Sequence, residues 1–396
     1  MLYVGIDIAS KKHDCAILED GKDIPTCLFT INNNKVGFVE LCKKIRSLEP
    51  HTNNIRIGVE ATGHYEHNLL GYLLKKGYNL SRANPLMMKR YKDKNTLRKT
   101  KTDKVDATCI AKALREGYVG FNPYTTLVYH NDEIKSLTRY KRDLIRERAA
   151  CKTKLARIIG LSFPELKEIF PTLSSPTVCR LLAVFPSAQA IANADLTIMS
   201  NILNDASRGH FGIDMARKLK ELAKNSIGEY SNAVSLEIKH LLSTIGSLSS
   251  QILEVNRSIQ DAIAQDDMLS GSIARVSSIP GVSKEMAAEI LAEIGDVNLF
   301  SSPDKILAFA GCSPSTYQSG ELSNGGSRLE KRGSRNLRYA LFMAAKSVCV
   351  FDPTFAKYLA KKRSTGKHYY CAVCHAVKKL VRVIYSLETR PHIYQS

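Results

Sequence analysis

A chain of 396 residues, 44% hydrophobic and 24% charged, is too long for one core and too apolar for disorder, so we expect two or three globular domains. The net charge of +19 indicates a polyanionic partner, and nucleic acid is a commoner one than an anionic membrane. Ten scattered Cys, no apolar stretch of membrane-spanning length and no secretory signal predict a cytoplasmic protein with no membrane association.

The first eighty residues have the pattern of an α/β sheet. Three runs rich in apolar and β-branched residues, separated by short turns, predict an antiparallel meander of strands at 2–9, 13–19 and 26–31. Further apolar runs predict a helix at 36–48, a strand at 55–59, a helix at about 65–76 and a strand at 78–82. Hairpin strands followed by strand–helix units are typical of a ribonuclease-H-like domain.

The middle of the chain is predicted to be helical. Apolar residues alternate steps of four and three at Val234, Ile238, Leu241, Ile245, Leu248, Ile252, Val255, Ile259 and Ala262. This seam predicts a coiled coil through which copies of the chain self-associate; a helix of the same chain packed along the seam is the alternative. A mostly α-helical unit follows. We therefore expect domains at 1–131, 132–270 and 271–396.

Four acidic residues lie in apolar strands or at the start of a helix, where a carboxylate needs a cation or a hydrogen-bond donor. Asp7 lies inside an apolar strand and Glu60 closes another, and an unpaired buried charge is costly. Asp103 and Asp106 lie three residues apart on one face of a predicted helix. Together they could hold Mg²⁺, and two ions would activate a nucleophile and stabilise the leaving oxygen of a phosphodiester. Taken singly, Asp103 could be a helix-dipole partner and Asp7 a charge at a hairpin edge.

A basic block adjoins these acids. Between positions 89 and 104 there are eight Lys or Arg and two Asp, a net charge of +6. Such a block predicts contacts to a phosphate backbone, with a solvated surface as the alternative. The residues expected to make these contacts are Lys89, Arg90, Lys92, Lys94, Arg98, Lys99 and Lys101. A second basic helix at 139–157 leaves both interpretations open.

The third unit contains a Ser- and Gly-rich basic loop. No residue adjacent to Ser319 is an evident base, so chemistry alone does not single it out as a nucleophile. The cations expected to contact phosphates after it are Arg328, Lys331, Arg332, Arg335 and Arg338. Farther on, Cys371-Ala372-Val373-Cys374-His375 has the spelling of a haem-attachment motif, but it lies in an apolar helical run and is interpreted as a core helix.

Several segments together resemble the insertion-sequence transposases that have a RuvC-like DEDD domain and a C-terminal serine domain. Relatives of that family include Piv-type DNA invertases and bridge-RNA-guided recombinases. The likeness covers nearly the whole chain, although 132–264 is long for the family's shorter members. It rests on Gly5-Ile6-Asp7, Glu60-Ala61-Thr62-Gly63-His64-Tyr65, Thr102-Asp103-Lys104-Val105-Asp106-Ala107, Ile279-Pro280-Gly281-Val282, Phe309-Ala310-Gly311, Gln318-Ser319-Gly320 and Lys331-Arg332-Gly333-Ser334.

The resemblance implies a transposase or recombinase of a mobile element that uses Mg²⁺. Asp7, Glu60, Asp103 and Asp106 would be its metal-binding and catalytic tetrad, and Ser319 its nucleophile. DNA is the implied partner; a guide RNA and a homo-oligomer, either dimer or tetramer, are further expectations.

Four alternatives remain at this point. A RuvC-like junction endonuclease would hydrolyse DNA with water, and a site-specific invertase would use the same chemistry to invert a segment. A kinase-like ATPase and a non-catalytic DNA-architectural protein come from other functional classes.

Overall fold

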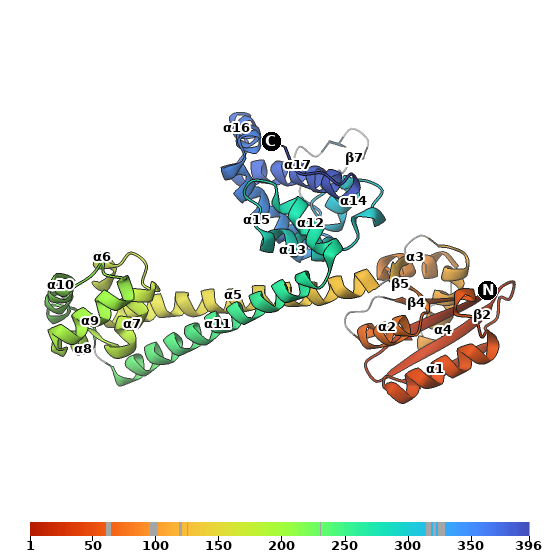
Figure 1. Cartoon of the computed structure of the whole chain (residues 1–396), viewed down its shortest axis with the longest axis horizontal. Helices are drawn as coiled ribbons and strands as arrows, with labels where there is room; N and C mark the ends of the chain where they lie inside the picture. The colour runs from red at the N-terminus through yellow and green to blue at the C-terminus, as the bar shows by residue number, and fades with distance from the viewer. Residues whose placement is uncertain are drawn as a thin grey trace. The chain divides into compact units, whose positions relative to one another are not determined.

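The computed structural model describes residues 1–60, 65–95, 102–118, 121–124, 126–229, 231–313, 318–319, 322–323 and 329–395. The chain divides into two compact units, one made of residues 1–133 with 275–396 and the other of residues 134–274. Figure 1 labels many of their elements. In the described part of the chain, no helix has both the length and the apolar character needed to cross a membrane.

A mixed six-stranded sheet forms the first part of the chain, in the order β3-β2-β1-β4-β5-β6. The strands are β1 (Leu2–Ile8), β2 (Lys12–Glu19), β3 (Cys27–Asn32), β4 (Ile55–Glu60), β5 (Asn79–Ala83) and β6 (Phe121–Tyr124). The first three are antiparallel, β4 and β5 run parallel to β1, and β6 is antiparallel to β5. The predicted meander and the two later strands are confirmed, and β6 is an addition that the sequence pattern did not predict.

Side chains alternate along β1 between two helical layers. On one face, Leu2, Val4, Ile6 and Ile8 share a core with residues of α1 (Lys35–Leu48) and α2 (Glu66–Lys75). On the other face, Tyr3 packs against α4 (Asp103–Arg115). Gly5 and Asp7 have the same parity as Tyr3 and therefore face α4. The helix α3 (Pro85–Asn95) packs beside α4, and a short 3₁₀ turn spans Thr52–Asn54.

The helix α4 comes into backbone contact with the sheet at Gly5. A Cβ atom at this position would lie 2.1 Å from the carbonyl oxygen of Ala107 and 2.4 Å from the amide nitrogen of Ala111. Both alanines are fully buried. Only a glycine in the strand, facing small residues on the helix, allows so close an approach. Because Asp7 follows Gly5 by two residues and Asp106 precedes Ala107, this contact brings two of the predicted site acids toward one another.

The second unit is built on two long helices, α5 (Thr126–Ser162) and α11 (Asn232–Ala264), which lie side by side (Figure 1). Shorter helices cover one end of the pair: α6 (Leu166–Ile169), α7 (Pro176–Val184), α8 (Ala188–Asn193), α9 (Leu196–Ser207) and α10 (Ile213–Lys224).

The predicted apolar seam is the buried face of α11. Leu248, Ile252, Val255 and Ile259 form a cluster with Leu144 of α5. The intramolecular alternative therefore describes how the seam is covered, and a second copy of the chain is not needed to cover it.

The residues from 275 onward form a mostly helical body, as predicted. Its helices are α12 (Asp267–Ser277, which begins in the second unit), α13 (Lys284–Ile294), α14 (Pro303–Phe309), α15 (Arg335–Phe351), α16 (Pro353–Ser364) and α17 (Tyr369–Thr389), with a 3₁₀ turn at Val297–Leu299. A two-stranded hairpin pairs β7 (Gln318–Ser319) with β8 (Leu322–Ser323). The Cys-Ala-Val-Cys-His segment lies in α17, where Val373 and Val377 are buried, so its interpretation as a core helix is confirmed.

A Gly5→Ala substitution tests the contact between α4 and β1. The added methyl group has to push the helix away from the sheet, so we expect the free energy of unfolding to fall by about 1–3 kcal/mol. Gly160→Ala on α5 is the matched control, because a Cβ there meets no atom within 4 Å and alanine favours a helix. Denaturant unfolding measures both variants, and an unchanged stability of Gly5→Ala would contradict the close contact.

Candidate active site

Two of the four acids come from neighbouring parallel strands. Asp7 is the penultimate residue of β1, and Glu60 is the last residue of β4. Ile6 and Val59, which precede them, are paired in the parallel register. Asp7 and Glu60 therefore leave the sheet at adjacent positions on its carboxyl edge, where polar groups of neighbouring strands converge.

The other two acids lie in the first turn of α4. Thr102 caps this helix, and its hydroxyl accepts a hydrogen bond from the Val105 amide at 3.4 Å. The cap fixes where the helix begins and so places Asp103 and Asp106 one turn apart on the same face. Asp106 is buried, and Asp103 is exposed.

Asp7 responds electrostatically to all three other acids. Burial raises the pKa of Asp7 to about 6, and the negative charges of Asp106, Asp103 and Glu60 contribute to the rise. Burial alone raises the pKa of a carboxyl group, and like charges nearby raise it further. Asp7 thus lies within electrostatic range of the other three predicted acids. As they stand, no three His, Cys, Asp or Glu side chains among the described residues are near enough to one another to hold a metal ion.

Lys92 of α3 reaches into this acid cluster. Its Nζ lies 3.0 Å from Asp106 Oδ1 and 3.6 Å from Glu60 Oε2, and the Lys92 side chain is 24% exposed. Burial disfavours the charged ammonium, but the hydrogen bond to Asp106 and the charge of Glu60 outweigh it and raise the pKa of Lys92. Lys92 was predicted to contact nucleic acid; here it is the ion-pair partner of two site acids.

The cluster has the chemistry of a site for a hard divalent cation. Carboxylate oxygens are the ligands that Mg²⁺ accepts in proteins. Besides burial, the charges of Asp106, Asp103 and Glu60 raise the pKa of Asp7, and a bound cation would offset those charges. The donor set therefore fits the cofactor predicted from the sequence.

The rest of the predicted basic block is only partly described. Lys89, Arg90 and Lys94 are exposed on α3, where a phosphate backbone could reach them. Arg98, Lys99 and Lys101 lie outside the described residues.

A partly buried ion-pair network, which the sequence reasoning missed, joins β5 to α2 and α5. Arg82 of β5 is paired in register with Val59. Its Nη2 lies 2.7 Å from Glu66 Oε1, and its Nη1 lies 3.2 Å from Asp132 Oδ2. Glu66 is 1% exposed. A charged Arg within a strand was the available signal for a buried partner.

Two segments that flank β7 and β8 in the sequence are paired by backbone hydrogen bonds. The Lys331 amide donates to the Gly311 carbonyl at 3.2 Å, and the Ser334 amide donates to the Phe309 carbonyl at 2.8 Å. Segments 309–311 and 331–334 are two of those on which the family resemblance rests. Part of their role is therefore to stabilise one another through these hydrogen bonds.

Ser319 itself lies in β7 and pairs with Leu322. Its side chain, the neighbouring residues 314–317, 320–321 and 324–328, and hence Arg328, fall outside the part of the chain that the structure describes.

The Arg338 side chain hydrogen-bonds to two backbone carbonyls of its own chain. Its Nη1 donates to the Ala310 carbonyl at 2.9 Å and to the Lys331 carbonyl at 3.3 Å. Lys331 has a left-handed backbone, with φ of 53°. Arg338, predicted to bind phosphate, thus links Ala310, which follows α14, to Lys331, which precedes α15. Lys331, Arg332 and Arg335 are exposed.

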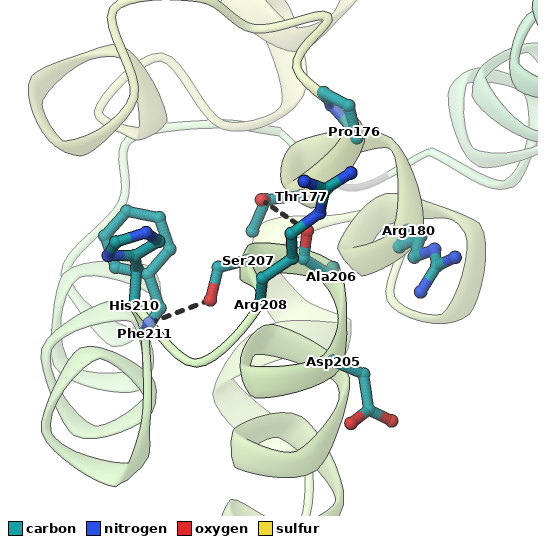
Figure 2. Close-up of a pocket in the computed structure, with 9 residues that line it drawn as sticks. All are labelled: Pro176, Thr177, Arg180, Asp205, Ala206, Ser207, Arg208, His210 and Phe211. Carbon is teal, nitrogen blue, oxygen red and sulfur yellow. Dashed lines mark hydrogen bonds between the residues drawn. The ribbon is translucent and has the colours of Figure 1, made fainter.

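A cavity of about 520 Å³ lies apart from these acids in the second unit, between α7 and the end of α9. Figure 2 shows Arg208 projecting toward Pro176 and Thr177 at the start of α7. None of the residues predicted to carry chemistry lines this cavity, so it does not bear on the carboxylate site.

Comparison with known proteins identifies the family. A model of the IS110 DEDD type, described as transposase, matches residues 4–164, and a second, described as transposase of the IS116/IS110/IS902 family, matches residues 273–360. The chain belongs to the IS110/IS116 transposase family. Its members cut and join DNA strands, so DNA is a partner of this transposase. The matches give no support to the ATPase or the architectural alternative.

Individual relatives of this transposase align over nearly all of their length. It is 25% identical over 393 residues to the pilin gene-inverting protein of Moraxella lacunata, covering 98% of this chain and 97% of the relative. It is 23% identical over 402 residues to the mini-circle putative transposase for IS117 of Streptomyces coelicolor, covering 99% and 95%. With the IS116 uncharacterized 44.8 kDa protein of Streptomyces clavuligerus it shares 22% identity over 395 residues, covering 98% and 94%.

Substituting Arg338 distinguishes a structural role from a phosphate contact. Arg338→Ala removes the guanidinium donor to the Ala310 and Lys331 carbonyls, so we expect the free energy of unfolding to fall by about 1–3 kcal/mol. Arg335→Ala, at an exposed position on the same helix, should change it by no more than about 0.5 kcal/mol. Denaturant unfolding without DNA makes the comparison. Equal stability of the two variants would show that Arg338 does not hold this segment.

Proposed function

We propose that this transposase cuts and rejoins DNA at a Mg²⁺-dependent site formed by Asp7, Glu60, Asp103 and Asp106, with Ser319 as the nucleophile. The observation that supports the proposal is geometric: Asp7 and Glu60 end neighbouring parallel strands at adjacent positions, and Lys92 lies within ion-pair distance of both Glu60 and Asp106. A cluster of acids that repel one another is unfavourable unless it serves to bind a cation.

The chemistry that we propose divides the work among residues of this chain. The four acids would hold Mg²⁺, which when bound polarises the phosphodiester and lowers the pKa of a nearby hydroxyl. Lys89, Arg90 and Lys94 on α3 would neutralise neighbouring phosphates and hold the DNA backbone in register.

The strand-transfer step conserves the number of phosphodiester bonds. The Ser319 oxygen attacks phosphorus and its proton passes to solvent; the bond from phosphorus to one deoxyribose oxygen breaks, and that oxygen takes up a proton from solvent and leaves as a hydroxyl. The hydroxyl of a different DNA end then attacks the phosphoserine and releases Ser319. Ser319 and the four acids must therefore act on the same phosphate.

The strand order supports the proposal of a ribonuclease-H-like, RuvC-like N-terminal domain. Three antiparallel strands are followed by two strands parallel to the first, in the order β3-β2-β1-β4-β5. We also propose 1–131, 132–270 and 271–396 as the domains. The compact unit at 134–274 supports the bounds of the second domain, whereas the first family match continues past 131 to residue 164.

The partners beyond DNA remain proposals. A guide RNA and a dimer or tetramer both suit a reaction that joins several strands. An oligomer would need a surface other than the seam of α11, since α5 covers that seam. The likeness to the pilin gene-inverting protein favours inversion of a DNA segment as a second possible outcome of the same chemistry.

Replacing a site acid tests the metal-dependent step. Asp7→Asn or Asp106→Asn removes a ligand charge, so we expect strand exchange to fall at least about 100-fold. DNA binding should stay within a few-fold of the wild type. Asp20→Asn, at an exposed turn of the same domain, is the control and should retain activity. Strand exchange is followed on labelled DNA; full activity of either site variant, or of the wild type in excess EDTA, would refute the proposal.

Trapping a covalent intermediate tests the nucleophile. We expect a protein–DNA adduct on a nicked substrate in a denaturing gel, with the modification mapped to Ser319, and no adduct with Ser319→Ala. Ser323→Ala, on the paired strand of the hairpin, should still form it. Cleavage without an adduct, or undiminished cleavage by Ser319→Ala, would favour the junction endonuclease that uses water.

A further inference from the structure

The feature that the proposed chemistry leaves unexplained is the position of Lys92. Other cations of α3 are exposed, but the Lys92 ammonium lies within ion-pair distance of Asp106 and Glu60. These are two of the acids proposed to hold Mg²⁺. A lysine ammonium and a divalent cation compete for the same carboxylate oxygens, and they repel each other.

We infer that Lys92 is a built-in counter-ion that neutralises the acid cluster in the metal-free protein and that a divalent cation must displace from Asp106 and Glu60. The inference rests on the proposed metal-dependent function.

Exchange of one cation for the other is physically accessible. The side chain of Lys92 is 24% exposed, so its ammonium has a route to water. Its four-carbon stem is flexible, so the ammonium can leave the acids while α3 stays in place. Asp7 and Asp103 also face the cluster, and their charges would draw in the incoming cation.

The exchange has a cost and a benefit for the protein. Breaking a charge-assisted hydrogen bond to Asp106 weakens the apparent affinity for metal. In return, the metal-free site is not left with four uncompensated acids. The displaced ammonium then joins Lys89, Arg90 and Lys94 on α3, where it can contact phosphate.

Metal affinity of Lys92 variants is the first test. Lys92→Met keeps the apolar stem and removes the competing charge, so we expect Mn²⁺ to bind at least about tenfold more tightly than to the wild type. Lys43→Met, at an exposed position of α1 on the opposite face of the sheet, removes the same charge and should leave the affinity unchanged. Mn²⁺ binding is measured on the full-length protein by electron paramagnetic resonance of the free ion.

A second variant guards against a failure of folding. Lys92→Gln retains a hydrogen-bond donor for Asp106 without the charge, and it should also tighten Mn²⁺ binding. Unchanged or weaker binding in a folded Lys92 variant would overturn the inference.

Chemical labelling of the wild type gives an independent reading. A displaced ammonium is more accessible to an amine-acylating reagent. Because the Lys92 side chain is 24% exposed in this structure, Mn²⁺ should raise its rate of modification at least about threefold. Lys43 should show no change when both are followed by peptide mass spectrometry. If Mn²⁺ leaves the rate at Lys92 unchanged or lowers it, the inference is wrong.

The outcomes separate this inference from the proposed function. If the wild type binds Mn²⁺ through Asp106 and Lys92→Met binds it no more tightly, the exchange is contradicted. The proposed metal site is not affected by that result. If neither the wild type nor Lys92→Met binds Mn²⁺ at millimolar concentration, both the metal site and the exchange are refuted.

Discussion

The candidate active site depends on one backbone contact, where α4 meets β1 at Gly5. With a Cβ excluded by Ala107 and Ala111, no other residue fits at this position without separating helix from sheet. The two alanines lie four apart and form one small-residue face along α4. Because of that face, the start of α4 lies close to the end of β1, and Asp106 is brought toward Asp7.

The electrostatic character of the site follows from this packing. Acids from two strands and one helix share a partly desolvated volume, and the pKa of Asp7 rises as a result. Such a cluster destabilises a folded protein unless a cation compensates it. In the structure that cation is Lys92, and in the proposed reaction it is Mg²⁺. The same repulsion therefore makes the site costly in isolation and suited to binding a metal.

The sequence predicted the helices and strands better than it predicted which elements pack against one another. Alternation along 2–8 identified β1, and the heptad spacing of 234–262 identified the buried face of α11. Periodicity reports that a face is buried and does not report what covers it, so self-association was expected where α5 packs instead. The four acids were predicted as site residues because a charge in an apolar strand or at the first turn of a helix needs a partner.

The charged residues show where such reasoning stops. A run of basic residues gives a net charge but does not reveal which side chain turns inward. Lys92 follows the buried Tyr91 and lies four residues after the buried Met88, a helical signal that was available but weak. Arg338 offered no comparable signal. Its acceptors are the backbone carbonyls of Ala310 and Lys331, and only the tertiary structure brings these within its reach.

Anomalous diffraction from crystals grown with Mn²⁺ tests the central claim most directly. If the contact at Gly5 gathers the four acids into one cation site, an anomalous peak will lie between Asp7 and Asp106, with Lys92 turned away from both Asp106 and Glu60. A crystal at saturating Mn²⁺ with no peak among these acids, and with Lys92 still paired to Asp106, would contradict the account.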